Sequence, residues 1–416
     1  MDYIGIILYI IQNIFILIRY YRKNDGYLQF PFIMALVSIG VELPQLTTIY
    51  AQPALYPPNL IPSLLFTMIT TNIAFVIGYE MAVKKPKHET YFIQIDFSSF
   101  YFFLLIYCLC GFVCLIMYDG NQYQQNQDNV IQIFLKTFSN VAFAISLSAI
   151  IRGENSISTK FILFLSIIPI IGYAFFIKGS RTETMTLFLS LVYFLGKKYE
   201  QHRYRLRFVV LCFFFIGTIL SSSIALLRNV MKGNENFDLI TSDLVVNEFE
   251  KSFTMSYSDW GMDLGNAAYA IEFCKENNDY DYGYGQVWNT IIQDFLPKRL
   301  IGENIKESFL IPYRYMPYTD ELRSGTTVMT CYFSCFSAFS YFGSILAFFF
   351  AYFIGIIWRK ADQSSFYMFL HLFLVGYFAI FITHGLYYGY SRITFILLFV
   401  YPLLLMSKSL YKTEIS

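Results

Sequence analysis

Residues 97–118 read FSSFYFFLLIYCLCGFVCLIMY and contain no Asp, Glu, Lys or Arg. A run of about 20 apolar residues in helical form crosses the hydrocarbon core of a bilayer. A helix is the expected conformation for such a run, because it satisfies its backbone hydrogen bonds internally where no water is available. The stretch therefore predicts a membrane-spanning helix, and the rest of the chain repeats the pattern.

By the same rule the sequence predicts eleven membrane spans and an all-α polytopic membrane protein. Residues 1–227 hold spans one to eight, 228–326 form a large polar segment, and 327–416 hold spans nine to eleven. The ninth is long enough to tilt or to begin as a helix above the bilayer. The predicted spans are 2–18, 28–50, 60–82, 97–118, 130–151, 160–177, 182–196, 208–227, 327–357, 366–386 and 393–407.

Composition supports the membrane class. Hydrophobic residues make up 56% of the 416 residues and charged residues 14%, with a mean hydropathy of +0.48. Soluble domains carry roughly 25% charged residues. The net charge is +1 and the basic residues are dispersed over short loops, so the sequence gives no reason to expect nucleic acid as a partner. The seven cysteines include no CxxC pair, and we interpret them as small buried hydrophobes.

The distribution of Lys and Arg predicts the orientation. Positive charge follows residues 2–18, which favours a first span with the N-terminus outside over a cleaved signal peptide. The gaps that then face the cytoplasm hold 17 of the 30 Lys and Arg, whereas the external gaps 51–59 and 119–129 hold none. This agrees with the positive-inside rule. It places the C-terminus in the cytoplasm, and it places 228–326 outside with two short turns at 178–181 and 387–392.

The polar segment 228–326 is acidic, with sixteen Asp and Glu against nine Lys and Arg. Its apolar spacing predicts helices at 244–257, 264–273 and 286–295. Arginines at the membrane edge of such an acidic segment indicate anion recognition, because guanidinium binds phosphate through two parallel hydrogen bonds. The candidates for anion binding are Arg181, Arg228, Arg299, Arg314 and Arg392, with Lys178 and Glu183 beside Arg181. Interfacial snorkelling and local salt bridges are the alternative explanation.

Two ionisable residues within apolar spans are functional candidates, His384 and Glu42. His384, near the outer end of span ten, is a candidate base, and a histidine that bonds between helices is the alternative. Glu42, next to Pro44 in span two, would pair with an arginine or mark a cavity. The sequence has no Walker loop, Rossmann fingerprint, Ser-His-Asp order or metal-ligand spacing. These absences argue against an ATP-driven pump and against a transferase with a cytoplasmic nucleotide-sugar domain.

The layout and several short motifs resemble the oligosaccharide repeat-unit polymerases of bacterial O-antigen and capsule, the Wzy-type family. The large external segment in the second half is shared, and Lys178-Gly179-Ser180-Arg181 resembles the family's Gly-Ser-Arg turn. Ser324-Gly325 stands where the family usually has Gly-Gly. The remaining motifs are Leu296-Pro297, Ser324-Gly325-Thr326-Thr327 and Phe339-Ser340-Tyr341-Phe342-Gly343.

The resemblance implies a membrane glycosyltransferase of GT-C-like architecture in the bacterial plasma membrane. It would join undecaprenyl-diphosphate-linked oligosaccharides at the outer face, without cofactor, nucleotide or metal, and often beside a polysaccharide chain-length regulator. Arg181 and Arg228 would bind one diphosphate, Arg299 or Arg314 the other, and His384 would lie near the acceptor. Two alternatives stay open, an O-antigen ligase and a lipid-linked oligosaccharide flippase or transporter.

Overall fold

The computed structural model describes most of the membrane helices and only parts of the polar segment. The described residues are 2–51, 59–85, 91–117, 130–177, 181–199, 201, 205–210, 212, 263–276, 288–289, 291–292, 295–296, 301–311 and 330–414. Within them, eight helical spans are long and apolar enough to cross a membrane. A ninth is added if α18 (Ser365–Val375) and α19 (Phe378–His384), which bend at the break between them, form one span. The chain therefore has the largely helical, multi-pass organisation expected from its composition.

The helices form two compact units, one of which comprises residues 1–85, 253–356 and 378–395. In this first unit α1 (Asp2–Tyr21) packs against α2 (Phe30–Val37) and α4 (Leu60–Val83). α2 continues through a π-helical turn, η2 (Ser38–Glu42), into α3 (Leu43–Ala51). The wide turn has a local cause, because Pro44 lacks an N–H and its ring would clash with the carbonyl of Gly40 in a regular helix.

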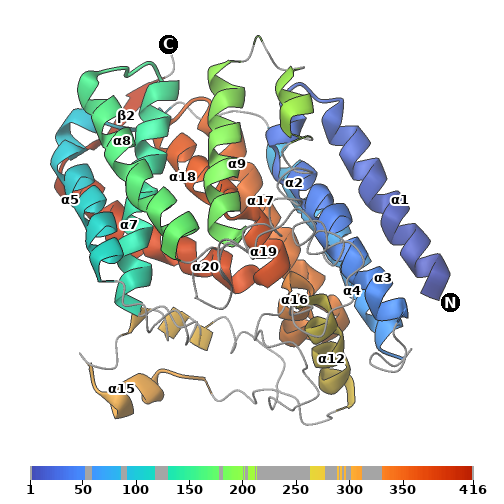
Figure 1. Cartoon of the computed structure of the whole chain (residues 1–416). Helices are drawn as coiled ribbons and strands as arrows, with labels where there is room; N and C mark the ends of the chain where they lie inside the picture. The colour runs from blue at the N-terminus through green and yellow to red at the C-terminus, as the bar shows by residue number, and fades with distance from the viewer. Residues whose placement is uncertain are drawn as a thin grey trace, which may run out of the picture. The chain divides into compact units, whose positions relative to one another are not determined.

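The other helices of the first unit come from the second half of the chain. α12 (Asp263–Glu276) and α16 (Cys331–Phe339) pack against each other and against α4, as Figure 1 shows. α12 confirms the helix predicted at 264–273. The helix predicted at 244–257 lies outside the described residues, and that at 286–295 is described only in short helical pieces. α15 (Glu303–Ser308) is a short exposed helix.

The predicted ninth span is divided. α16 ends at Phe339, and α17 (Ser344–Ala361) begins after a short 3-10 turn, η6 (Ser340–Phe342). Ser340 has a φ of 54°, and a Cβ on Gly343 would lie 1.7 Å from the carbonyl oxygen of Cys335. The chain folds back so tightly here that only glycine fits at position 343.

The external turn predicted at 387–392 is wrong. Those residues lie in α20 (Leu386–Phe395), which continues through η7 (Ile396–Val400) into α21 (Tyr401–Met406) as one apolar span. The turn is instead at Gly385, whose φ of 117° is accessible to glycine. The run Leu386–Phe395 contains no proline, and its one glycine is helical, so the polar side chains alone do not end the helix.

The second unit comprises residues 86–252, 357–377 and 396–416. Its helices are α5 (Phe97–Ile116), α7 (Val130–Ile151), α8 (Ile157–Ile171) and α9 (Arg181–Lys198), with the π-helical turn η3 (Gly172–Ile177) after α8. α7 packs against α5, α8 and α18. The predicted seventh span corresponds to α9, which is not among the eight, and most of the eighth (208–227) lies outside the described residues.

The second unit also holds a small sheet that the all-α prediction lacked. β1 (Tyr91–Ile95) pairs antiparallel with β2 (Leu410–Glu414), in a register that sets Ile93 opposite Lys412. Gln94 fixes the sheet to α18, because its amide donates to the carbonyl of Gln363 (2.8 Å) and its Oε1 accepts from the N–H of Ser365 (2.8 Å). The strand that precedes α5 is thereby held beside the C-terminal strand.

Candidate functional site

The structure describes the predicted site residues unevenly. His384 and Arg392 are fully described and belong to the first unit. Arg181 and Glu183 lie in the first turn of α9, in the second unit, with their side chains outside the description. The remaining four, which are Lys178, Arg228, Arg299 and Arg314, lie outside the described residues. His384 and Arg392 are the predicted site residues whose side-chain surroundings the structure describes.

His384 is the last residue of α19 and is half-buried. Thr383 Oγ1 donates to the carbonyl oxygen of Ala379 (3.1 Å) and lies 2.8 Å from His384 Nδ1. In the tautomer that carries its hydrogen on Nδ1, the Thr383 oxygen accepts from Nδ1–H while the Thr383 hydroxyl donates to Ala379. The neutral ring then has Nε2 as the nitrogen that can take a proton, which is the state a general base requires.

Arg392 lies within α20, seven residues after Gly385, and it is half-buried. It is on the helix that follows His384, and α19 packs against α20. The ring of Tyr388 meets that of His384 edge-on, with centroids 5.8 Å apart. The corrected position of the turn therefore places Arg392 inside a membrane helix rather than in an external loop.

The break after His384 brings a second polar residue close. A Cβ on Gly385 would lie 2.7 Å from Ser334 Oγ of α16. Ser334 is 3% exposed. A larger residue at 385 would therefore displace Ser334 in addition to straining the backbone. The close approach places α16 beside the end of α19.

A buried carboxylate lies on the other side of α16. Glu42 Oε2 accepts hydrogen bonds from Tyr9 Oη (2.7 Å) and from Tyr332 Oη (2.5 Å). Tyr332 Oη also lies 3.3 Å from Asn72 Oδ1, and the Asn72 amide donates to Asn13 Oδ1 at 3.3 Å. All five side chains are at most 1% exposed. Glu42 Oε1, in contrast, has no donor among the described residues.

The partners of Glu42 differ from the sequence hypothesis of an arginine. They include two tyrosine hydroxyls, from α1 and α16, and the hydroxyl of Ser38 in the same π-helical turn. The π-helical turn Ser38–Glu42 presents the carboxylate to both helices, and π-turns are frequent at functional sites. An isolated carboxylate in an apolar medium is unfavourable by several kcal/mol unless it is hydrogen-bonded, paired or protonated. Two tyrosine hydroxyls on one oxygen supply hydrogen bonds of this kind to Glu42.

These groups define what we call the α16 site, which consists of Tyr9, Glu42, Asn72, Tyr332, Ser334 and His384. Tyr332 and Ser334 are two residues apart on one nine-residue helix, so they face opposite sides of it, with the carboxylate network on one side and the end of α19 on the other. The site combines a carboxylate, a candidate base and several hydroxyls. Within this set, His384 is the side chain that can deprotonate a hydroxyl group.

α12 connects the polar segment to this site. It packs against α3, α4, α16 and α19. Gly265, Ala267, Ala268 and Ala270 are buried, and such small residues allow helices to approach closely. At its ends the N–H of Leu264 donates to Gln45 Oε1 (3.0 Å), and Asn59 Nδ2 donates to Glu272 Oε1 (3.4 Å).

His371, the other described histidine, lies in the core of the second unit. Its ring packs between Tyr193 and Trp358, with centroids 4.5 and 5.1 Å away, and it is fully buried. The described residues contain no group of three or more His, Cys, Asp or Glu that would hold a metal ion. Comparison with family models, with curated proteins and with solved structures found no match to the chain.

Proposed function

We propose that the chain is a polymerase that joins undecaprenyl-diphosphate-linked oligosaccharide repeat units into a surface polysaccharide at the outer face of the bacterial plasma membrane. The observation that carries the proposal is the packing of α12. A helix from the polar segment lies on the same membrane helices that hold Glu42 and His384. A lipid-linked sugar needs this arrangement, because its lipid remains in the bilayer while its sugars are polar.

In the proposed reaction, a hydroxyl oxygen of the incoming unit forms a bond to the anomeric carbon of the growing chain. The bond between that carbon and the diphosphate oxygen breaks, and the lipid diphosphate leaves with the electron pair. The hydroxyl proton passes to His384 Nε2, since Nδ1–H is held by Thr383. Arg181 and Arg228 stabilise the diphosphate charge, and Arg299 or Arg314 binds the second diphosphate.

The polysaccharide profile of a deletion strain tests the proposal, with the gene restored as wild type or as single variants. Loss of the long ladder, with single repeat units left on the lipid or core, is the expected result. Restoration with Arg181→Ala or His384→Gln is expected to leave the ladder missing, because each removes a proposed role. Lys160→Gln, an exposed change, is the matched control and is expected to restore the ladder. Normal polymer with Arg181→Ala contradicts the assignment.

A second candidate function, transport of a lipid-linked oligosaccharide, is favoured by Glu42. A buried membrane carboxylate with one oxygen lacking a described donor is also what a proton-coupled transporter requires. The same experiment separates the classes. Loss of the ladder together with the single repeat units on the core favours transport of the lipid-linked oligosaccharide, whereas polymer that accumulates on the lipid carrier without attachment indicates the ligase.

A further inference from the structure

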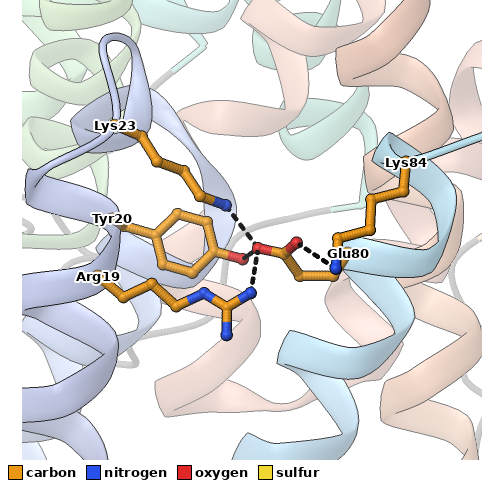
Figure 2. Close-up of polar contacts among 5 residues, drawn as sticks. All are labelled: Arg19, Tyr20, Lys23, Glu80 and Lys84. Atoms are coloured by element: carbon orange, nitrogen blue, oxygen red, sulfur yellow. Dashed lines mark hydrogen bonds and ion pairs between the residues drawn. The ribbon is translucent and has the colours of Figure 1, made fainter.

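A charged cluster joins the ends of α1 and α4, away from the α16 site. Glu80 Oε1 lies 2.5 Å from Lys23 Nζ and 3.4 Å from Arg19 Nη2, and Glu80 Oε2 lies 3.6 Å from Lys84 Nζ. Tyr20 Oη donates to the same Oε1 (2.6 Å). Figure 2 shows the carboxylate of Glu80 between Arg19, Tyr20 and Lys23 on one side and Lys84 on the other, so that three cations converge on one anion.

The cluster carries more positive charge than its carboxylates neutralise. The described ends of the two helices contribute five cations, Arg19, Arg22, Lys23, Lys84 and Lys85, against two carboxylates, Asp25 and Glu80. The side chain of Glu80 is 12% exposed, whereas those of Arg19, Lys23 and Lys84 are 39%, 37% and 70% exposed. The anion therefore lies beneath a surface of cations, and it holds them together against their mutual repulsion.

An apolar stripe on α1 leads to these cations. Ile7, Ile11 and Phe15 are 53%, 57% and 62% exposed. Their spacing of four residues continues to Arg19 on the same face of the helix. Only 22% of this span is buried, so the stripe is a surface for lipid. An apolar stripe that ends in a group of exposed cations matches a phospholipid, whose acyl chain ends in a phosphate.

We propose that the cluster of Arg19, Lys23 and Lys84 binds the phosphate of an anionic membrane lipid, with an acyl chain along Ile7, Ile11 and Phe15. Arg19 supplies the planar donor group that matches phosphate, and the two lysines add point charges. The distribution of Lys and Arg assigns this end of α1 to the cytoplasmic leaflet. This lipid site is distinct from the proposed catalytic site, and neither depends on the other.

The test uses the full chain in nanodiscs of phosphatidylcholine, alone or with added phosphatidylglycerol, and measures retained lipid by native mass spectrometry. Wild type is expected to retain phosphatidylglycerol in preference to phosphatidylcholine. Arg19→Gln/Lys84→Gln is expected to weaken that preference about 25-fold, because each cation near an anionic lipid contributes about a fivefold factor. The exposed Lys160→Gln is the matched control and is expected to match wild type. Lys84→Gln alone changes the most exposed of the three cations, and it is expected to weaken the preference for phosphatidylglycerol about fivefold. This single variant replaces the double variant in the test if the double variant does not fold.

Three results would overturn the lipid site. One is a wild type that retains both lipids equally. Another is a Lys160→Gln variant that loses as much of the preference for phosphatidylglycerol as Arg19→Gln/Lys84→Gln does. The third is full competition by inorganic phosphate, since a site for a free anion would not need the apolar stripe. None of these outcomes bears on the polysaccharide profile, so the two proposals fail separately.

Discussion

Glu42 is the residue on which the buried polar network depends. Its Oε2 accepts from Tyr9, 33 positions before it, and from Tyr332, 290 positions after it. The carboxylate therefore links α1 and α16 through a single atom. A hydrogen bond to a charged group contributes about 1.5–3 kcal/mol, and loss of one partner leaves the other incompletely solvated.

The first prediction concerns Tyr332. Tyr332→Phe is expected to lower the free energy of unfolding by about 1–3 kcal/mol, because Glu42 loses a buried donor. Glu42→Gln keeps the shape of the side chain and removes its charge. In a protein that already carries Glu42→Gln, Tyr332→Phe is therefore expected to lower the free energy of unfolding by about 0.5 kcal/mol less, or by a larger margin. Denaturant unfolding of the four purified forms in one detergent measures the cycle.

Tyr101→Phe is the matched control for the Tyr332 prediction. Tyr101 is half-buried in α5, its ring lies 6.2 Å from that of Phe97, and its hydroxyl has no hydrogen bond to another described residue. It is expected to change the free energy of unfolding by less than about 0.5 kcal/mol. Strict additivity of Tyr332→Phe and Glu42→Gln would mean that the hydroxyl and the carboxylate do not interact.

At the scale of single elements, the N-terminus of α5 depends on Asp96. Asp96 Oδ1 accepts from the N–H of Ser98 (3.0 Å) and from Ser98 Oγ (2.6 Å), and Oδ2 accepts from Ser99 Oγ. These hydrogen bonds, from Ser98 first and then Ser99, hold the pKa of Asp96 below its usual value. A lowered pKa means that the stabilisation is present above the unfolded-state pKa of about 4 and is lost as the pH falls through the folded-state pKa.

The second prediction follows from this cap. Asp96→Ala is expected to lower stability by about 1 kcal/mol at neutral pH, and the deficit is expected to shrink as the pH falls below about 4. Ser156→Ala removes the cap of α8, where Ser156 Oγ accepts from the N–H of Thr159 (3.1 Å), and it serves as a control without charge. Its deficit is expected to be independent of pH in the same thermal-unfolding series. A pH-independent deficit in Asp96→Ala would contradict the argument.

The third prediction concerns the close packing of α4 and α17. A Cβ on Gly78 would lie 2.2 Å from the carbonyl oxygen of Phe348, a backbone atom that cannot rotate away. Alanine normally favours a helix over glycine by about 1 kcal/mol, but forced overpacking costs about 1–3 kcal/mol, and here the overpacking should dominate. Gly78→Ala is therefore expected to lower the unfolding temperature. In Gly5→Ala the close atom is the movable Leu65 Cδ1 (2.9 Å), and little change is expected; equal behaviour of the two variants would refute the packing argument.

The elements that the sequence predicted are those with a local signal. Long apolar runs predicted α1, α4, α5 and α7, and the apolar spacing at 264–273 predicted α12. The turn predicted at 387–392 is wrong because polar side chains do not by themselves end a helix, and the backbone turns at Gly385 instead. The sheet was missed because its two five-residue strands lie at 91–95 and 410–414, and pairing over that separation leaves no local pattern.

The site shows the same division. The positions of His384 and Glu42 within apolar spans marked them as candidates, and both lie in the first unit. Their neighbours Tyr332 and Ser334 gave no signal, because a tyrosine and a serine in an aromatic run are ordinary in a membrane helix. Their part in the site follows from the packing of α16, which brings Tyr332 to Glu42 and Ser334 to Gly385. The arginines proposed to bind diphosphate stay predictions.

At the scale of the whole molecule, the β1–β2 pairing constrains the topology. Paired strands lie on one side of the membrane, so the chain crosses the membrane an even number of times between residue 95 and residue 410. The described spans in that interval begin at Phe97, Phe134, Ile157, Ser344 and Leu386, and α18 with α19 adds one more, which makes six. Six is an even number, so the spans in the described part of this interval agree with the pairing.

The fourth prediction tests that constraint. In a chain without its native cysteines, Ile93→Cys with Lys412→Cys is expected to form a disulfide under mild oxidation, because the two residues are directly opposite in the sheet. Ile93→Cys with Leu410→Cys, displaced by two residues, is the matched control and is expected to cross-link much less.

In intact cells, Ile93→Cys and Lys412→Cys, each as a single cysteine, are expected to resist a membrane-impermeant maleimide until the membrane is permeabilised, whereas Gln125→Cys in the predicted outer gap is expected to react at once. Labelling of Ile93→Cys and Lys412→Cys from opposite sides would rule out the sheet, and with it the even number of crossings.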